Sequence, residues 1–210
     1  MNEQLNEEQN EKESSQNSLR DFKILELPNV LSDSECRHLI HFHKTHQHMV
    51  TYNDAATHYN GRRIPFENIR TPNIRNLMRK VQYVSIAQIY GAYQDQVYPE
   101  QAEIMRWQVG MDQNPHIDKM ADPETGEDVY PETAWASILY LNDNYDGGKT
   151  FFEPCPELPM GFEIEPQAGK LVMFQGMEFY HGVTKVRRAE RYTLPFWYTR
   201  NVHTMAVDIQ

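Results

Sequence analysis

Residues 170–198 read KLVMFQGMEFYHGVTKVRRAERYTLPFWY. β-Branched and aromatic residues dominate this stretch, and Gln175-Gly176 and Ala189-Glu190 interrupt it. Such a composition, broken by short polar or glycine-containing pairs, is typical of strands joined by turns. The stretch therefore predicts three strands, over residues 171–174, about 180–186 and 191–198.

A histidine in the second of these strands has potential partners upstream. His116 and Asp118 are two residues apart, so on a strand both side chains would leave the same face. His181 from a distant strand would complete a set of two imidazoles and one carboxylate, which is the ligand set of non-heme Fe(II) oxygenases. We therefore predict a metal site at His116, Asp118 and His181, with residues 116–119 as a short strand that carries the first two.

Length and composition restrict the domain organisation of the chain and the classes of partner that it can bind. A length of 210 residues predicts one domain with a tail: residues 1–18 are polar and acidic and are expected to be disordered, and residues 19–210 form the domain. The net charge of −10 argues against nucleic acid or an anionic membrane as the main partner. No run is apolar enough for a membrane span or a signal peptide, which predicts a cytoplasmic protein. The oligomeric state stays open.

The remaining chain predicts helices first and strands later. Ser32 and Glu35 have the spacing of a capping box at the start of one helix, and Pro72 suits the first position of a second. From residue 102 onwards the segments are short and strand-like. Two helices followed by about eight short strands predict an α+β protein whose sheets form a sandwich or a barrel. Irregular segments around residues 51–70 and 120–134 are candidate substrate covers.

The first predicted helix carries a cluster of histidines, namely His38, His41, His43, His46 and His48. One interpretation is a second metal site, and the other is a partly solvated helix face. No carboxylate or cysteine is interleaved at ligand spacing, and at about 100° per residue His43 falls nearly opposite the edge shared by His38 and His41. The pattern therefore favours the solvated face.

Five motifs follow one another along the chain, two of which contain the predicted metal ligands. They are Asn-Pro-His116-Ile-Asp118, Leu139-Tyr-Leu-Asn142, Gly147-Gly148-Lys-Thr150-Phe-Phe152, His181-Gly-Val and Arg191-Tyr-Thr-Leu-Pro-Phe-Trp197-Tyr198. In combination they closely resemble the prolyl 4-hydroxylase-like group of Fe(II)/2-oxoglutarate-dependent dioxygenases, over residues 22–198. The resemblance implies a double-stranded β-helix (a cupin-like jelly-roll) with the N-terminal helices packed on one face.

The resemblance also implies a chemistry. Fe(II) would be the cofactor, 2-oxoglutarate and O₂ the cosubstrates, and ascorbate (vitamin C) a candidate further cofactor. The expected reaction is hydroxylation of an unactivated C–H bond, first of all in a prolyl residue of a peptide or protein, with succinate and CO₂ as coproducts. A free amino acid or another small molecule is the alternative substrate. Related halogenases have a small residue at the carboxylate position, so Asp118 favours hydroxylation.

Candidate residues for binding 2-oxoglutarate follow from charge and from the resemblance. Arg191 opens an otherwise apolar strand ten residues after His181, and its guanidinium matches a carboxylate in shape. By family position, Tyr140 would donate to the same carboxylate, and Thr150 and Trp197 would line the pocket.

The chain departs from the family pattern at two positions. Trp107 stands nine residues before His116, where many members have tyrosine, so an indole N–H replaces a hydroxyl. Ala189 stands two residues before Arg191, where glycine is frequent. The first change bears on a cosubstrate or substrate contact, and the second on the type of turn. Neither changes a predicted metal ligand.

Two functions of other classes compete with the oxygenase hypothesis. A cupin-like jelly-roll could use the three metal ligands for binding or isomerisation, without a need for Arg191 and Tyr140 as a carboxylate clamp. Alternatively, the domain could bind a protein partner through the acidic tail and keep only a vestigial metal site. Turnover of 2-oxoglutarate to succinate would contradict the first function. Deletion of residues 1–18 should destroy partner binding under the second function, whereas an oxygenase should keep its turnover.

Overall fold

The computed structural model describes residues 23–51, 61–119, 125–128, 131–156 and 158–206. The predicted tail at residues 1–18 lies outside the described residues, as do parts of both candidate substrate covers. Within the described ranges, no helix is both long enough and apolar enough to cross a membrane.

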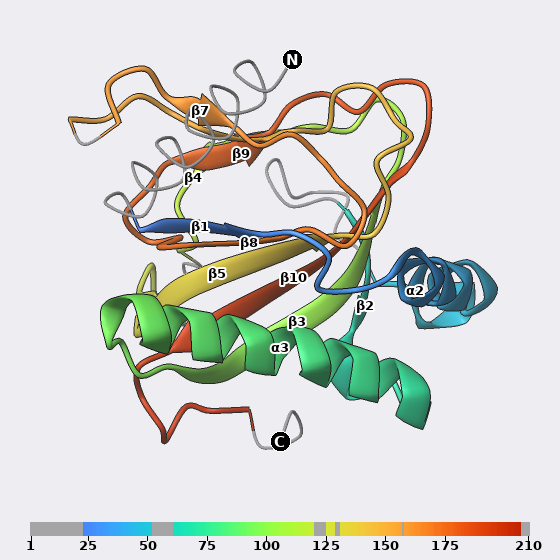
Figure 1. Cartoon of the computed structure of the whole chain (residues 1–210), viewed down its shortest axis with the longest axis horizontal. Helices are drawn as coiled ribbons and strands as arrows, with labels where there is room; N and C mark the ends of the chain where they lie inside the picture. Colours follow the sequence, from blue (N-terminus) through green and yellow to red (C-terminus); the bar gives the residue numbers. More distant parts are fainter. Residues whose placement is uncertain (1–22, 52–60, 120–124, 129–130, 157, 207–210) are drawn as a thin grey trace, which may run out of the picture.

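In the described part of the chain, ten antiparallel strands form two sheets, drawn one above the other in Figure 1. The larger sheet has the order β1 (Ile24–Leu27), β8 (Leu171–Phe174), β5 (Thr133–Tyr140), β10 (Arg191–Thr199), β3 (Tyr98–Trp107) and β2 (Arg62–Pro65). The smaller sheet has the order β4 (Gln113–His116), β9 (His181–Val183), β6 (Thr150–Phe152) and β7 (Phe162–Glu163). This two-sheet antiparallel arrangement confirms the predicted α+β class.

Two α-helices and two 3₁₀ turns complete the described structure: α2 (Asp33–Thr45), α3 (Pro72–Tyr93), η1 (Gln47–Met49) and η2 (Phe66–Asn68). The predicted capping box of α2 is present, with Ser32 and Glu35 each bonding the other's backbone N–H. Pro72 occupies the first turn of α3, as predicted. The two long helices therefore begin where the sequence indicates.

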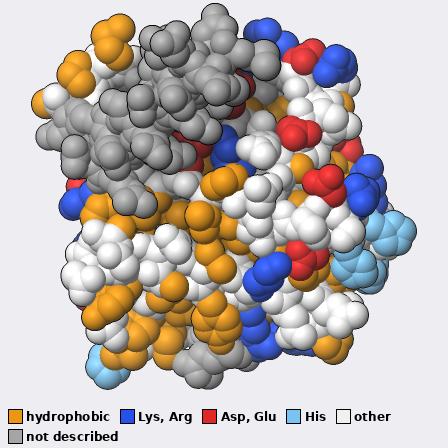
Figure 2. Space-filling view, in the orientation of Figure 1, with side chains coloured by type: hydrophobic (Ala, Val, Ile, Leu, Met, Phe, Trp, Pro, Cys, Tyr) orange, Lys and Arg blue, Asp and Glu red, His pale blue; other side chains and the backbone are white. Residues whose placement is uncertain are grey.

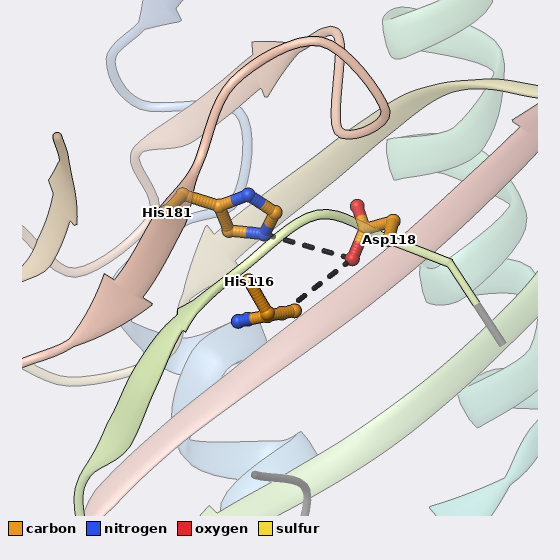
Figure 3. Close-up of side chains that lie close together, drawn as sticks. All are labelled: His116, Asp118 and His181. Atoms are coloured by element: carbon orange, nitrogen blue, oxygen red, sulfur yellow. Dashed lines mark ion pairs between the residues drawn. The ribbon is translucent and has the colours of Figure 1, made fainter.

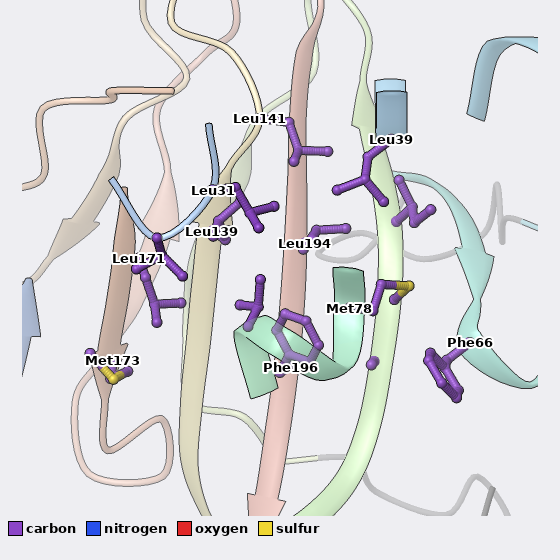
Figure 4. Packing of buried hydrophobic residues seen from close by; sticks show 14 of the residues in the cluster. Leu31, Leu39, Phe66, Met78, Leu139, Leu141, Leu171, Met173, Leu194 and Phe196 are labelled. Atoms are coloured by element: carbon purple, nitrogen blue, oxygen red, sulfur yellow. The ribbon is translucent and has the colours of Figure 1, made fainter. Parts of the chain in front are cut away.

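The main hydrophobic core lies between the helices and one face of the larger sheet (Figure 4). Alternation along β10 shows how it forms: Leu194 and Phe196 belong to this core, together with Leu139 from β5 and Met78 from α3. In Figure 1, α3 crosses the larger sheet on the side away from the smaller sheet. Helix α3 thus covers one face of the larger sheet, and the smaller sheet lies on the other side.

The opposite face of the larger sheet lines a cavity between the two sheets. Arg191, Thr193 and Trp197 of β10 contribute to its wall, as do His116 and His181 of the smaller sheet. Side chains alternate across a strand, so the residues next to these on β10 are the ones that pack against the helices. One strand therefore serves both the core and the cavity.

The histidines of α2 point in different directions, as the helical spacing indicates. His38 and His41 are exposed, and Figure 2 shows pale-blue side chains over the α2 end of the molecule. His43 is fully buried, and its Nε2 lies 2.9 Å from the Arg62 carbonyl oxygen. Within the described ranges, the one group of three or more side chains that could hold a metal lies elsewhere, at His116, Asp118 and His181.

Three strand boundaries differ from the sequence predictions. Strand β4 ends at His116, so the predicted strand over residues 116–119 is wrong and Asp118 lies in the following loop. Arg62–Pro65, part of a segment predicted as a long loop or a broken hairpin, pairs with β3 as an edge strand. Strand β9 covers His181–Val183 within the longer predicted range 180–186. Each difference arises from pairing with a distant segment, which local composition does not encode.

Candidate active site

His116 and His181 come together because their strands are neighbours. They are directly paired in the antiparallel ladder of β4 and β9, and their ring centroids lie 4.4 Å apart. Directly opposite residues of an antiparallel pair present their side chains on the same face. The register of these two short strands therefore brings the two imidazoles together on the cavity side (Figure 3).

Asp118 reaches the same point from the loop after β4. Its backbone N–H donates to the carbonyl oxygen of Gly176 at 2.9 Å, which fixes the loop against the end of β8. A Cβ atom at Gly176 would overlap Oδ2 of Asp118, so a residue without a side chain is needed there. The carboxylate is thus positioned by a tertiary contact and not by strand alternation.

The three side chains form a compact, partly buried group. Oδ1 of Asp118 lies 3.5 Å from Nε2 of His181 and 3.8 Å from Nε2 of His116, and the candidate ligand atoms all lie within 4.8 Å of one another. Oδ2 of Asp118 is buried without a hydrogen-bond partner among the described residues. Buried polar atoms normally have partners, so this orphaned oxygen fits a site for a cation.

Backbone contacts fix the orientation of both imidazoles. Nδ1 of His116 lies 3.0 Å from the Asn114 carbonyl oxygen, and Nδ1 of His181 lies 2.9 Å from that of Phe179. A carbonyl can only accept, so each Nδ1 carries the proton and each Nε2 presents its lone pair to the cavity. This is the tautomer that a metal-ligating histidine needs. Two such nitrogens and one carboxylate fit Fe(II).

Electrostatics favour the ionised form of the carboxylate. Burial raises the pKa of Asp118, but His181 and His116 outweigh it, helped by a hydrogen bond from Trp197, and the pKa is lowered overall. Burial lowers the pKa of His181, but the Asp118 carboxylate outweighs it and raises that pKa overall. Protons and a cation would therefore compete for the His181 imidazole at low pH.

A buried arginine forms the other end of the cavity. Arg191 is 1% exposed, and its Nη2 donates to Oγ1 of Thr150 at 3.3 Å. No carboxylate of the described residues pairs with it, and its Nε has no hydrogen-bond partner there. Arg191 and Thr150 line the cavity, whereas the Tyr140 hydroxyl lies behind them and donates to Oγ1 of Thr150 at 2.7 Å. A buried, unneutralised guanidinium fits an anionic ligand.

The structure also reveals neighbours that sequence reasoning missed. The Gln113 side-chain amide nitrogen lies 3.2 Å from Nε2 of His116. The Tyr145 and Arg191 side chains lie close together, because both pack at Gly148. The Tyr145 hydroxyl is buried and has no hydrogen-bond partner among the described residues. Trp197 lines the cavity and also hydrogen-bonds to Asp118. Gln113 and Tyr145 belong to none of the motifs used, so no local signal marked them.

Comparison with known proteins places this geometry in a family context. The sequence model of the 2OG-Fe(II) oxygenase superfamily matches residues 102–199. The chain is 37% identical over 91 residues to human prolyl 3-hydroxylase 3, a match that covers 40% of this chain and 12% of that protein. The chain thus spans about an eighth of the length of this curated relative.

Solved structures share the fold over most of the chain. A Pseudomonas putida prolyl-4-hydroxylase has a TM-score of 0.70 at 18% identity, covering 88% of this chain and 96% of the other. A Trichoplax adhaerens prolyl hydroxylase in complex with a hypoxia inducible factor peptide fragment has a TM-score of 0.68 at 16% identity, covering 93% of each chain. The shared fold and the sequence match over residues 102–199 thus make this domain similar to prolyl hydroxylase-like 2OG-Fe(II) oxygenases.

Proposed function

We propose that the protein hydroxylates a prolyl residue in a peptide or protein, using Fe(II), 2-oxoglutarate and O₂ and releasing succinate and CO₂. The observation that carries the proposal is the convergence of His116, Asp118 and His181 in one cavity with the buried, unneutralised guanidinium of Arg191. A metal-binding site alone would not need such a cation. A site for a metal-chelating dicarboxylate needs both.

In this proposal His116, Asp118 and His181 hold the iron. The contacts of both Nδ1 atoms keep each Nε2 available, and the lowered pKa of Asp118 keeps its carboxylate charged at neutral pH. With these three protein ligands, bound iron would keep coordination positions free for 2-oxoglutarate and O₂. Bound iron supplies the oxidising chemistry, and the protein's part is to orient these ligands and to exclude bulk water.

Arg191 binds the distal carboxylate of 2-oxoglutarate in this proposal. Its planar fork and its burial give a strong, directional interaction with a carboxylate. Thr150 donates to the same carboxylate or positions the guanidinium, and Tyr140 orients the Thr150 hydroxyl from behind. The clamp would set the distance between the distal carboxylate and the metal, and so select a five-carbon 2-oxo diacid.

The prolyl substrate class rests on the relatives. The sequence relatives are named prolyl 3-hydroxylases, and solved structures of similar fold include prolyl-4-hydroxylases. One of those structures contains a peptide fragment. A proline-containing peptide is therefore the first substrate to test, with free proline and other amino acids as the small-molecule alternative.

The deciding experiment measures conversion of 2-oxoglutarate to succinate by the purified full chain with Fe(II) and ascorbate. Proline-containing peptides and free amino acids are then searched by mass spectrometry for a product heavier by one oxygen, and fragmentation and NMR assign the hydroxylated carbon. Chelation of the metal should abolish turnover. Arg191→Ala should abolish it as well, whereas the exposed control Arg188→Ala should not. Absence of succinate in every condition would refute the proposal.

A further inference from the structure

The indole of Trp107 carries an unused hydrogen-bond donor in the wall of the cavity. Trp107 is 2% exposed, and its Nε1 has no hydrogen-bond partner among the described residues. A buried tryptophan N–H usually finds a partner. The other two tryptophans follow this rule: Nε1 of Trp135 donates to Asp95 at 2.8 Å, and Trp197 hydrogen-bonds to Asp118. Trp107 is the exception, and it lines the cavity.

The position of Trp107 indicates what the missing acceptor is. It is paired directly with Arg191 across β3 and β10, and the Arg191 guanidinium carbon lies 5.5 Å from the centre of the indole ring. Nε of Arg191 is also buried without a partner in the described structure. An indole N–H and a guanidinium can donate but cannot accept, so two unpaired donors side by side call for a group that can accept from both. An ionised carboxylate is such a group.

We propose that the Trp107 indole N–H donates a hydrogen bond to the carboxylate that Arg191 holds, which makes Trp107 a cosubstrate-binding residue. The inference rests on the proposed function, in which this carboxylate is the distal one of 2-oxoglutarate. Trp107 thus contributes to selectivity for 2-oxo diacids over 2-oxo monoacids. The ring of Trp107 also packs against Met105 and Val183, so its orientation is set without the ligand.

Calorimetric titration with 2-oxoglutarate, under anaerobic conditions with Mn(II) in place of Fe(II), tests the role. Trp107→Phe keeps an aromatic ring and removes the N–H. We expect it to bind 2-oxoglutarate about tenfold more weakly, the lower end for loss of a hydrogen bond to a charged group. Mn(II) affinity should be unchanged. The matched control Trp135→Phe removes an indole N–H on the other side of the sheet and should leave 2-oxoglutarate affinity unchanged.

A second ligand separates the distal carboxylate from the rest of the molecule. 2-Oxopentanoate has the metal-chelating end of 2-oxoglutarate but no distal carboxylate, so wild type and Trp107→Phe should bind it equally. An equal loss for both ligands, or no loss for 2-oxoglutarate, would overturn the role of Trp107 while leaving the proposed function intact. A wild type that binds no 2-oxoglutarate would overturn the proposed function itself.

A measurement on the unmutated chain covers the case in which Trp107→Phe does not fold. With Zn(II) bound, the indole ¹⁵N–¹H signal of Trp107 should move downfield when 2-oxoglutarate is added, because the N–H gains a charged acceptor. The signal should not move in this way with 2-oxopentanoate, and that of Trp135 should stay in place with both. A Trp107 signal that responds identically to both ligands would contradict the inference.

Discussion

His116 and His181 face each other across strands β4 and β9, and the Nδ1 atom of each is held by a backbone carbonyl two residues earlier in the chain. The same local device therefore orients both imidazoles, although the two strands come from distant parts of the sequence. Its consequence is that both Nε2 atoms face the cavity before any ligand binds. Such preorganisation lowers the cost of binding a metal.

Loss of one imidazole should break the metal site. We expect His181→Ala to lower Mn(II) affinity by at least about 100-fold, because changing residues that merely orient the metal ligands already costs about 10–100-fold. Succinate formation should fall to background. Calorimetry with Mn(II) measures the first effect, and the exposed His38→Ala on α2 is the control. A His181→Ala protein that binds Mn(II) as wild type does would contradict the assignment.

Gly176 should be essential for the metal site although it has no side chain. A Cβ atom at this position would overlap Oδ2 of Asp118, so Gly176→Ala must displace the carboxylate or the β8 end. We expect Mn(II) affinity to fall by about 10–100-fold, the range for misplaced metal ligands. Gly91→Ala is the matched control, since a Cβ there meets nothing within 4 Å. On the helix that control should raise stability by about 0.5–1 kcal/mol.

The buried His43 should make the fold sensitive to acid. Burial lowers its pKa to about 4, against the opposing effect of the Arg62 carbonyl. The unfolded chain, with a pKa of 6.5 for this group, binds the proton first as pH falls. The stability contribution is therefore complete above pH 6.5 and is lost towards pH 4, by about 3 kcal/mol at most.

Denaturant unfolding of wild type and His43→Gln at several pH values measures this effect. Arg106 and Glu190 are the charged groups that act on His43, and they stay in place in the variant. His43→Gln should show a shallower loss of stability between pH 6.5 and 4, and the exposed His41→Gln should follow the wild-type curve. Parallel curves for wild type and His43→Gln would show that His43 does not carry the dependence.

Removal of residues 1–18 should leave catalysis intact. All residues proposed for the iron and 2-oxoglutarate sites lie at or after residue 107, and the acidic segment supplies none of them. We expect succinate formation and the KM for 2-oxoglutarate to be unchanged in the truncated chain. Loss of turnover with the tail, while the domain stays folded, would contradict this prediction. Under the partner-binding alternative, the same truncation should destroy partner binding.

Local signals predicted much of the fold and of the candidate site. Strand β8 has the predicted bounds because Gln175 and Gly176 end its apolar run, and α2 begins at the capping box of Ser32 and Glu35. The grouping of His116, Asp118 and His181 was also predicted, from ligand chemistry and family resemblance. Their role as iron ligands stays a proposal until metal binding is measured.

Long-range contacts limited the remainder of the predictions. Asp118 was expected on a strand, but the bond from its N–H to Gly176 holds it in a loop, and nothing in residues 114–119 encodes that partner. Strand β2 lies in a segment predicted as a long loop or a broken hairpin, and its bounds could not be predicted because they depend on pairing with β3. The contact between Trp197 and Asp118 joins segments that no motif connects.

The division of β10 between cavity and core restricts how the enzyme can change. Arg191 and Trp197 face the cavity, whereas Leu194 and Phe196 face the helices. An insertion or deletion of one residue within β10 would move the side chains on one side of the change to the opposite face of the sheet. Either the Arg191 guanidinium would then be buried in the hydrophobic core, or apolar side chains would face the cavity. New substrate preferences should therefore arise by length changes in the connecting loops, while the length of this strand stays fixed.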